Sequence, residues 1–195
     1  MEPEEARLLA CLAANLDAHF AELVTAYQHR LYVFVLRQTG SAQDAEDIVQ
    51  ETFLQAYFAL GNYPGWRVRT LRLQAWLYRI ALNLFYSRMR SAKPLLVSLG
   101  SEEGRLASFT AEVSQEEQPE SLFESQEARQ ELEACVARLP VHYREAINLY
   151  YFEGLTYQEI SDLLEQPMGT IKSYLYRGVR LLRKLAAETS EKGVR

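Results

Sequence analysis

The sequence predicts an all-α protein in which two small helical domains are joined by an acidic flexible linker. Apolar residues recur at spacings of three and four through most of the 195 residues, which is the period of an amphipathic helix. Alternating patterns typical of strands are scarce. Between about residues 94 and 127 the helical pattern gives way to glutamate, serine and glycine, a composition typical of a linker.

The first domain is expected over residues 17–93, after an N-terminal helical extension over residues 1–16. Its first helix should end at Gly40, because glycine accepts the left-handed conformation of a helix C-terminus. Ser41 is expected to cap the next helix, together with the Asp44 carboxylate. The turn residues at 61–65 and Pro94 limit the helices that they border. The three helices are predicted at about residues 17–39, 42–60 and 70–91.

The second domain is expected over residues 128–188, followed by a tail over residues 189–195. Pro140 interrupts its first apolar stretch, and Thr156-Tyr157-Gln158-Glu159 has the form of a capping box. A turn over residues 166–169 then separates a short helix from a longer basic one, which is the sequence form of a helix-turn-helix. The helices that follow Pro140 are predicted at about residues 141–152, 156–165 and 170–187.

Composition excludes several classes of protein. No stretch approaches the roughly 20 apolar residues of a membrane-spanning helix, and the acidic N-terminus does not resemble a signal peptide. We therefore expect a cytoplasmic protein with no stable membrane insertion. Cys11 and Cys135 both lie in apolar helical patterns, so we expect two reduced core thiols and no disulfide or metal site.

The formal net charge of −5 argues by itself against a nucleic-acid partner, but the charge is segregated along the chain. Residues 66–93 contain seven basic residues and no acid, and residues 168–187 contain five basic residues and no acid. Residues 38–65 contain four acids and no base, and residues 94–135 contain ten glutamates. The blocks predict two basic surfaces and two acidic ones, each with its own role.

The C-terminal basic helix carries outward-facing polar residues at its start, where a recognition helix reaches base edges in the major groove. These are Thr170, Lys172, Ser173, Tyr176 and Arg177. Arg180, Arg183 and Lys184 are better placed for phosphates. A solvated basic face on an ordinary helical hairpin is the competing interpretation, and the turn together with the acid-free run favours DNA binding.

The first basic block interleaves arginines with aromatic residues, which suits single-stranded or melted nucleic acid. Trp66, in a basic loop flanked by glycine and proline, is the better candidate for base stacking. Trp76 is expected in the core. Asn83 offers a donor and an acceptor for the edge of an unstacked base.

Four ordered motifs resemble the two signature regions of bacterial sigma factors of the sigma-70 family, and more narrowly the extracytoplasmic-function (ECF, group 4) subfamily. They are DAEDIVQETFLQAY from Asp44 to Tyr57, WLYRIALN from Trp76 to Asn83, LTYQEI from Leu155 to Ile160, and GTIKS from Gly169 to Ser173 followed by Tyr176-Arg177. The resemblance covers about residues 17–93 and 128–187.

The resemblance implies a sigma factor, which is not an enzyme and needs no cofactor or metal. Its partners would be core RNA polymerase, promoter DNA and an anti-sigma factor, and its acidic linker would run through polymerase channels. The implied polymerase-clamp residues are Asp44, Asp47, Gln50 and Glu51. The implied residues for opening the −10 element are Trp66, Arg67, Arg69, Arg79, Asn83, Tyr86, Arg88 and Arg90. The implied residues for reading the −35 duplex are Thr170, Lys172, Ser173, Tyr176, Arg177 and Arg180.

Two positions depart from the family pattern. The loop from Asn62 to Arg72 is more basic and aromatic than the family's, so the base preference at the −10 element does not carry over. Ser161 stands where the family usually has alanine, a change expected to be neutral if its hydroxyl bonds back to the helix.

Two other functions stay open at this point. Asp44, Glu46, Asp47 and Glu51 could form a Mg²⁺ site of an enzyme, although no histidine or glycine-rich phosphate loop lies near them. A stand-alone helix-turn-helix regulator would bind duplex DNA tightly without polymerase, usually as a dimer on paired half-sites.

Overall fold

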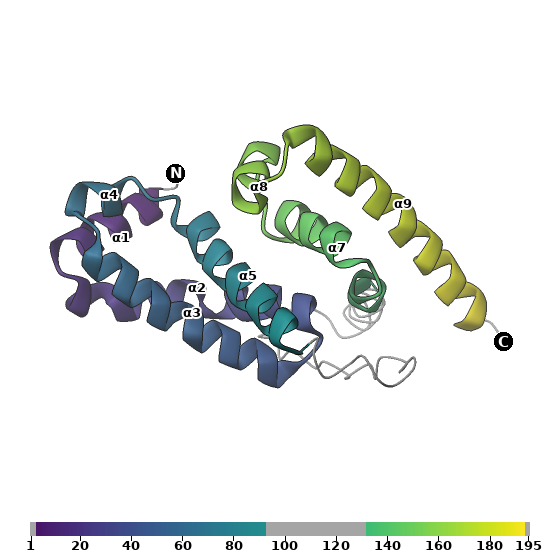
Figure 1. Cartoon of the computed structure of the whole chain (residues 1–195), viewed down its shortest axis with the longest axis horizontal. Helices are drawn as coiled ribbons and strands as arrows, with labels where there is room; N and C mark the ends of the chain where they lie inside the picture. The colour runs from purple at the N-terminus through teal and green to yellow at the C-terminus, as the bar shows by residue number, and fades with distance from the viewer. Residues whose placement is uncertain (1–2, 93–131, 194–195) are drawn as a thin grey trace, which may run out of the picture.

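The computed structural model describes residues 3–92 and 132–193, and every regular element within these ranges is a helix (Figure 1). The N-terminal group consists of α1 (Pro3–Ala14), α2 (Leu16–Thr39), α3 (Ala42–Asn62), α4 (Gly65–Arg69) and α5 (Leu73–Ala92). The C-terminal group consists of a helical segment over residues 132–137, α7 (Val141–Ile147), the π-helix η2 (Asn148–Phe152), α8 (Tyr157–Leu164) and α9 (Met168–Gly193). The all-α prediction is confirmed. The predicted linker over residues 94–127 lies outside the described residues.

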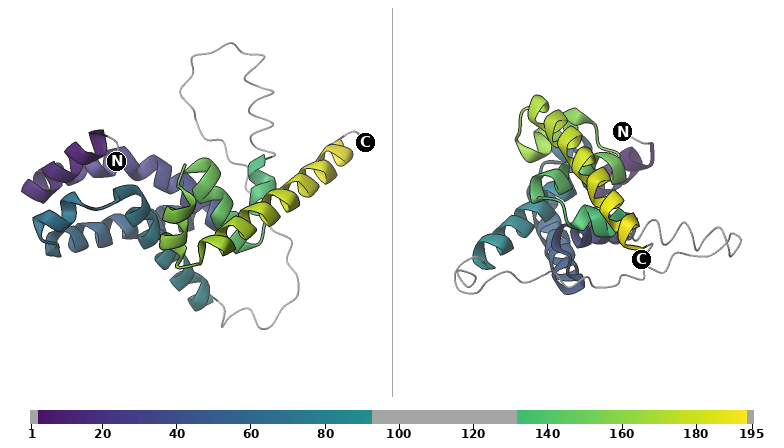
Figure 2. Two further views of the ribbon diagram at one scale, coloured as in Figure 1. Left: turned by 90° about the horizontal axis from the view of Figure 1, so that it is seen from above. Right: turned by 90° about the vertical axis from the view of Figure 1, so that its right-hand side faces the viewer.

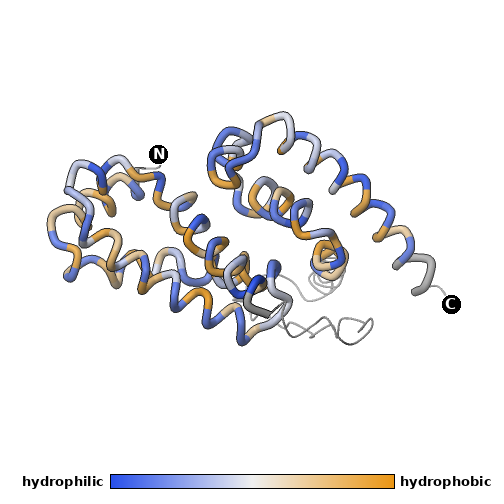
Figure 3. Tube along the Cα trace, viewed as in Figure 1, coloured by the Kyte–Doolittle hydropathy of each residue, from blue (hydrophilic) through white to orange (hydrophobic). Residues whose placement is uncertain are grey.

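The N-terminal group is built around α2, which packs against α1, α3 and α5. Leu8, Leu9 and Leu12 of α1 are buried, and α1 also packs against α4. The segment expected as an extension therefore contributes to the same core as the following helices. Figure 3 shows hydrophobic and hydrophilic positions alternating along each helix, as amphipathic helices require.

The predicted boundary between the first two helices is confirmed in its geometry. Gly40 has φ 69° and ψ 8°, and its N–H donates to the Leu36 carbonyl at 2.8 Å. Glycine lacks the Cβ that makes this left-handed conformation costly. The Ser41 hydroxyl then accepts the Asp44 N–H at 3.3 Å and starts α3.

The loop between α3 and α5 differs from the prediction. A short helix, α4, replaces part of the expected turn, and buried Val68 anchors it to the core. Helix α5 begins at Leu73 instead of about residue 70, and the Leu73 N–H donates to the Glu5 carboxylate at 2.8 Å. Because that cap comes from α1, local sequence could not place it.

In the C-terminal group, the predicted helix over residues 141–152 divides into α7 and η2. The capping box at the start of α8 is confirmed in both of its hydrogen bonds. Helix α9 starts at Met168, because the Pro167 carbonyl accepts from the N–H groups of Thr170 and Ile171 at 2.8 and 3.2 Å. It continues to Gly193, through residues expected as a tail.

Gly178 sets how closely α9 approaches α7. A Cβ built on Gly178 would lie 2.8 Å from the Ile147 Cδ1 and 3.2 Å from the Tyr143 Cβ. The small residue lets the two helix backbones pack tightly, which fixes the direction of α9. Figure 2 shows α9 projecting beyond the rest of the described C-terminal group.

The two groups of helices pack against one another, with α5 against α8 and α2 against α7. Figures 1 and 2 show the C-terminal group lying along α5. Tyr78, from the middle of α5, is only 2% exposed. Among the described helices, none is both long enough and apolar enough to cross a membrane.

Candidate nucleic-acid and protein-binding surfaces

The start of α9 presents a polar, basic face to solvent. Ile171 and Leu175 are buried and fix the helix against its neighbours, while Tyr176 is 73% exposed. Thr170 is half-buried at the edge of this face. The structure brings the other predicted residues together as exposed side chains on one side of the helix: Lys172, Ser173, Tyr176, Arg177 and Arg180.

Contacts with α8, within α9 and in the turn between them hold this face in place. The Lys172 ammonium lies 5.8 Å from the centre of the Tyr157 ring, and the Ser173 hydroxyl donates to the Gly169 carbonyl at 2.9 Å. The Ser161 hydroxyl donates to the Gln166 carbonyl at 2.6 Å. Ser161 thus bonds forward to the turn, instead of back to its own helix, and fastens the end of α8 to the start of α9.

The predicted residues of the first basic block fall into two separate sets. On α4, Trp66 is 68% exposed, and the Arg67 guanidinium lies 4.1 Å from the centre of the Tyr63 ring. Trp76 packs partly buried against the core, in agreement with its expected role. Figure 1 shows α4 at the opposite end of the N-terminal group from the end of α5 that carries Arg88 and Arg90. The structure therefore does not gather all eight residues at one point.

The second set lies along α5. Its members are Arg79, Asn83, Tyr86, Arg88 and Arg90. The spacing of Arg79, Asn83 and Tyr86 at four and three residues places them on one side of the helix. Asn83, Arg88 and Arg90 are exposed, whereas Arg79 and Tyr86 are half-buried.

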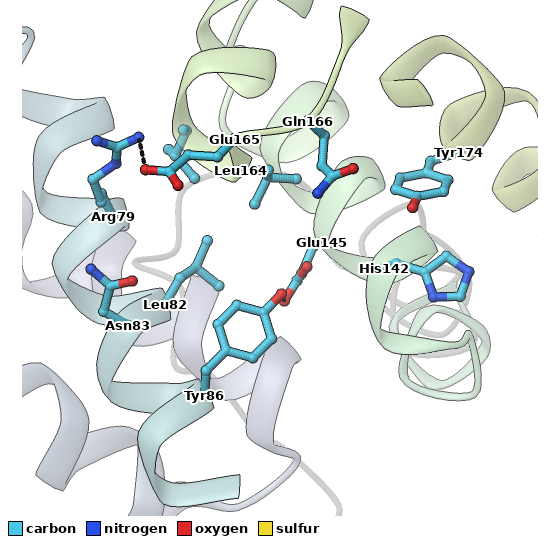
Figure 4. A pocket seen from close by; sticks show the side chains of 11 residues that line it. Arg79, Leu82, Asn83, Tyr86, His142, Glu145, Leu164, Glu165, Gln166 and Tyr174 are labelled. Atoms are coloured by element: carbon cyan, nitrogen blue, oxygen red, sulfur yellow. Dashed lines mark hydrogen bonds and ion pairs between the residues drawn. The ribbon is translucent and has the colours of Figure 1, made fainter. Parts of the chain in front are cut away.

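A pocket of about 350 Å³ separates this part of α5 from the C-terminal group (Figure 4). The Arg79 guanidinium forms an ion pair of 3.3 Å with Glu165, from the end of α8. The Tyr86 hydroxyl donates to the carboxylate of Glu145 on α7. Burial raises the pKa of Glu145 to about 7, although the hydrogen bond from Tyr86 and the charge of Arg144 act in the opposite direction.

A second contact between the groups surrounds Glu153, in the turn after η2. Its carboxylate accepts a hydrogen bond from the Tyr78 hydroxyl and lies 3.7 Å from the Arg30 guanidinium and 4.0 Å from that of Arg37. Its carbonyl accepts from the Gln74 amide at 2.8 Å. Burial is the main cause that raises the pKa of Glu153, while Tyr78 and the arginines lower it.

Arg72 makes the outermost of these contacts between the two groups of helices. Its guanidinium forms an ion pair of 2.7 Å with Glu159, the residue that also closes the capping box of α8. Burial disfavours the charged form of Glu159, but the hydrogen bonds from Thr156 and the Arg72 charge outweigh it, so its pKa is lowered.

Sequence reasoning named Arg79 and Tyr86 for another role and did not predict any of these contacts between the groups. The paired residues lie 59 to 123 positions apart, from Tyr86 and Glu145 to Arg30 and Glu153, and no local pattern connects them. The sequence signal available was weak: Glu153 follows an apolar run directly before a glycine turn, where an acid is unexpected unless it has a partner.

The acidic residues predicted on α3 lie together on its outer side. Asp44, Asp47 and Gln50 are exposed and Glu51 is half-buried. The Arg88 guanidinium lies 3.3 Å from the Asp47 carboxylate and 3.9 Å from that of Asp44. No group of three or more metal-ligating side chains occurs within residues 3–92 and 132–193.

Two exposed apolar residues, which sequence reasoning missed, extend the acidic row along α3. Leu54 is 56% exposed and Phe58 is 66% exposed. Successive steps of four, three and four residues lead from Asp47 through Glu51 and Leu54 to Phe58, which places all four on one stripe of the helix. The sequence signal was present, because both residues fall outside the apolar pattern that the core uses. We define the α3 stripe as Asp44, Asp47, Gln50, Glu51, Leu54 and Phe58.

Comparison with known proteins gives matches in both groups of helices. The family model of sigma-70 region 2 matches residues 23–94, and the model of sigma-70 region 4 matches residues 129–182. The ECF RNA polymerase sigma factor SigW of Bacillus subtilis is 34% identical over 168 residues, which cover 85% of this chain and 87% of that protein. The RNA polymerase sigma-H factor of Pseudomonas aeruginosa is 32% identical over 160 residues, which cover 81% of each chain.

A solved structure agrees with these matches. The sigma factor RpoE of Bartonella quintana, in complex with the anti-sigma factor NepR, superposes with a TM-score of 0.68 and 25% identity over 85% of this chain and 95% of that one. The two matched regions and the relatives define a promoter-specific transcription initiation factor, and the chain belongs to the sigma-70 family of RNA polymerase sigma factors. Within that family it is a sigma factor of the ECF group, which confirms the resemblance read from its motifs.

Proposed function

We propose that the chain directs initiation through three surfaces, each assigned to one step. The α3 stripe binds the clamp of core RNA polymerase, α4 and α5 open the −10 element, and α9 reads the −35 duplex. The observation that supports the proposal is the order of these surfaces: an acidic stripe, a basic and aromatic pair of helices, and an exposed recognition face follow one another in one chain. The corresponding domains span residues 17–93 and 128–188.

The α9 face has the chemistry for reading duplex DNA. Lys172 and Arg177 supply donors for acceptors on base edges, and Arg180 lies one turn further along, where it can contact phosphate. Thr170, Ser173 and Tyr176 complete the face. A good contact to a base edge contributes about 1–3 kcal/mol of discrimination between sequences.

The α4 and α5 residues have the chemistry for melted DNA. Trp66 exposes a large ring beside the positive charges of Arg67 and Arg69, and stacking stabilises an unpaired base by roughly 1–3 kcal/mol. Asn83 offers its amide to the edge of a base that has left the stack. Arg79, Tyr86, Arg88 and Arg90 continue this surface along α5.

The α3 stripe combines carboxylates at one end with apolar side chains at the other. Its carboxylates suit a basic partner, and Leu54 and Phe58 supply apolar area that is exposed in the free chain. We assign the whole stripe to the basic coiled coil of the polymerase clamp. Exposed apolar surfaces also suit an anti-sigma factor, and a Bartonella quintana relative was solved with such a partner.

We infer that the chain has no catalytic activity of its own and requires no cofactor or metal. The chemistry of initiation then belongs to the polymerase, and the chain contributes binding energy alone. Because the polymerase and the promoter are in the cytoplasm of a bacterium, the chain acts there.

Reconstitution with sigma-free core polymerase tests the proposal. The purified chain is added to core enzyme with a library of genomic fragments, and the transcript 5′ ends are mapped. We expect initiation at discrete positions that share upstream sequence. Absence of initiation from every fragment would overturn the proposal, and tight specific duplex binding without polymerase would favour the stand-alone regulator.

Two variants separate the assigned steps. Asn83→Ala should reduce permanganate reactivity of unpaired thymines while leaving binding of the upstream duplex unchanged. Arg177→Ala should weaken binding of the upstream duplex by roughly 5- to 100-fold, which corresponds to one lost base contact. Arg138→Ala removes an exposed arginine outside both surfaces and serves as the matched control.

A further inference from the structure

The N-terminal helix α1 lies outside the three surfaces assigned above, yet it packs against α4, the short helix that carries Trp66 (Figure 1). It also precedes residues 23–94, the segment that the family model of region 2 matches. We propose that α1 positions α4 for the opening of the −10 element, and that Glu5 is the positioning residue. This inference rests on the proposed function, because it takes the Trp66 side chain to bind unpaired DNA.

Helix α4 depends on its neighbours for its geometry. It spans only Gly65–Arg69, and no side chain caps its first turn, so its stability comes from packing. Its buried residue, Val68, is 3% exposed and belongs to the apolar cluster that also contains three leucines of α1. These are Leu8, Leu9 and Leu12. Helix α1 therefore covers the side of α4 that faces the core.

The start of α4 also lies against α1. A Cβ built on Gly65 would lie 3.6 Å from the Ala13 carbonyl oxygen, which is ordinary contact distance. With its start and its buried side both against α1, α4 has one side left for solvent. The exposed side chains there are Trp66, Arg67 and Arg69. The direction in which they project is thus set by where α1 lies.

Glu5 connects α1 to the first residue of α5. The Arg72 carbonyl accepts from the Trp76 N–H at 2.9 Å, which places Arg72 at the N-cap position of α5. A guanidinium offers only donors, so the Arg72 side chain cannot accept from the free N–H groups of the first turn. The Glu5 carboxylate supplies an acceptor instead, to the N–H of the fully buried Leu73 at 2.8 Å. Its negative charge also suits the positive end of a helix.

Contacts of aromatic rings lead from the start of α5 back to α4. The centre of the Trp76 ring lies 6.2 Å from that of Tyr63, and the Arg67 guanidinium lies 4.1 Å from the centre of the same Tyr63 ring. At the other end of α4, the Thr70 hydroxyl donates to the carbonyls of Trp66 and Arg67 at 3.3 and 3.1 Å. A shift in the start of α5 is therefore passed to both ends of α4.

Helix α1 can position α4 because it is itself fixed to the core. The Arg7 guanidinium forms an ion pair with Glu22 of α2, and Leu9 is completely buried. Since α2 is the helix against which α1, α3 and α5 all pack, α1 has a fixed place in the N-terminal group. Loss of the Glu5 carboxylate should therefore loosen the start of α5 and α4 while α1 stays in place.

Three variants of the full chain test Glu5. Glu5→Ala removes the acceptor from the Leu73 N–H. Glu5→Gln keeps an oxygen acceptor and should restore most of the native behaviour. Glu4→Ala changes the net charge by the same amount as Glu5→Ala, at an exposed position in the same turn of α1, and is the matched control.

The first measurement follows Trp66 without DNA. Each variant is made in a Trp76→Phe background, which leaves Trp66 as the only tryptophan and keeps an aromatic ring beside Tyr63. Fluorescence anisotropy reports the mobility of the Trp66 ring, at a temperature where circular dichroism shows every variant to be folded. We expect a lower anisotropy in Glu5→Ala than in Glu4→Ala, and an anisotropy close to the native one in Glu5→Gln.

The second measurement follows opening of a promoter found by the reconstitution described above. The variants, with Trp76 retained, are assembled with core polymerase, and time-resolved permanganate reactivity gives the rate of opening. At saturating holoenzyme we expect Glu5→Ala to open the promoter roughly fivefold more slowly than Glu4→Ala, the size of one lost helix cap, with initial binding unchanged. General loss of folded protein would lower the amount of open promoter and leave its rate of formation unchanged.

Each outcome decides a separate point. Equal anisotropy in Glu5→Ala and Glu4→Ala overturns the positioning of α4 by Glu5, whatever the rate of opening. A lower anisotropy with an unchanged rate of opening overturns the role of this positioning in opening the −10 element. If the native chain supports no initiation, the proposed function fails, whereas normal initiation by the native chain with equal rates in the two alanine variants overturns this inference alone.

Discussion

At the scale of single residues, the buried carboxylates of Glu145 and Glu153 are the least ordinary groups in the molecule. Each lies between the two groups of helices and hydrogen-bonds to a tyrosine of α5. Burial raises the pKa of both carboxyls, and it also raises the pKa of the partner tyrosines, Tyr78 and Tyr86. The folded molecule therefore binds protons more tightly at these sites than an unfolded chain does.

The stability of the fold should consequently depend on pH below neutrality. Because the pKa of Glu145 is raised to about 7, its contribution is fully present below the ordinary carboxyl pKa of about 4.5 and is lost as pH rises to about 7. We expect the melting temperature to fall between pH 5.5 and 8, with a loss of stability on the order of 2 kcal/mol. Thermal unfolding followed by circular dichroism measures this change.

Glu145→Gln provides the comparison, since glutamine cannot ionise. Its melting temperature should change less over the same pH range. Four other groups face this site: Arg144 from the same helix, Tyr86 from α5, and His142 and Tyr174 at the pocket wall. The variant His142→Gln measures the part of the pH dependence that comes from the histidine. An equal pH dependence in the native chain and in Glu145→Gln would contradict the assignment.

At the scale of elements, α8 depends on its N-terminal cap. It spans only Tyr157–Leu164, and so short a helix has little stability of its own in water. The Thr156 hydroxyl accepts from the Glu159 N–H at 3.3 Å, and the Glu159 carboxylate accepts from the Thr156 N–H at 2.9 Å. Both bonds keep Glu159 positioned for Arg72, so one motif supports the helix and the contact with the residue that precedes α5.

Thr156→Ala should lower the free energy of unfolding by about 1 kcal/mol, because the Glu159 N–H loses its acceptor. Chemical denaturation measures the change. Thr156→Ser, which keeps the hydroxyl, should unfold close to the native midpoint. If the alanine and serine variants unfold alike, the cap does not stabilise α8.

At the scale of the whole molecule, the two groups of helices form a common interface. Leu77, Tyr78 and Leu82 of α5 and Ile160 and Leu163 of α8 belong to one buried apolar cluster. The Arg37 guanidinium contributes from α2, where it lies 4.0 Å from the centre of the Phe152 ring. Groups that share buried surface stabilise one another, and their unfolding is then coupled.

Calorimetry should detect this coupling. At pH 6 we expect the native chain to unfold in one transition, with calorimetric and van't Hoff enthalpies that agree. The triple variant Y78F/E159Q/E165Q should unfold in two resolved transitions, because the contacts between the groups are weakened. Two transitions in the native chain at pH 6 would show that the groups unfold independently.

Local patterns in the sequence predicted most helices, because capping residues and apolar periodicity act over a few positions. The Ser41 cap, the Gly40 end and the Thr156 box all appear where the residues indicated them. The family assignment also came from local motifs. The start of α5 was displaced by the Glu5 carboxylate of α1, which is 68 positions away and has no local signature.

The sequence by itself thus determined the helices, the segregated charges and the exposed polar face of α9, since each depends on neighbouring residues. Only the tertiary structure decided which charges meet. Arg79 was predicted to face DNA, and in the folded chain it faces Glu165; Glu153 carried no predicted role, and it lies buried among Tyr78, Arg30 and Arg37. The physical reason is that helix propensity and capping act within a turn or two of helix, whereas ion pairs and burial depend on how distant helices pack.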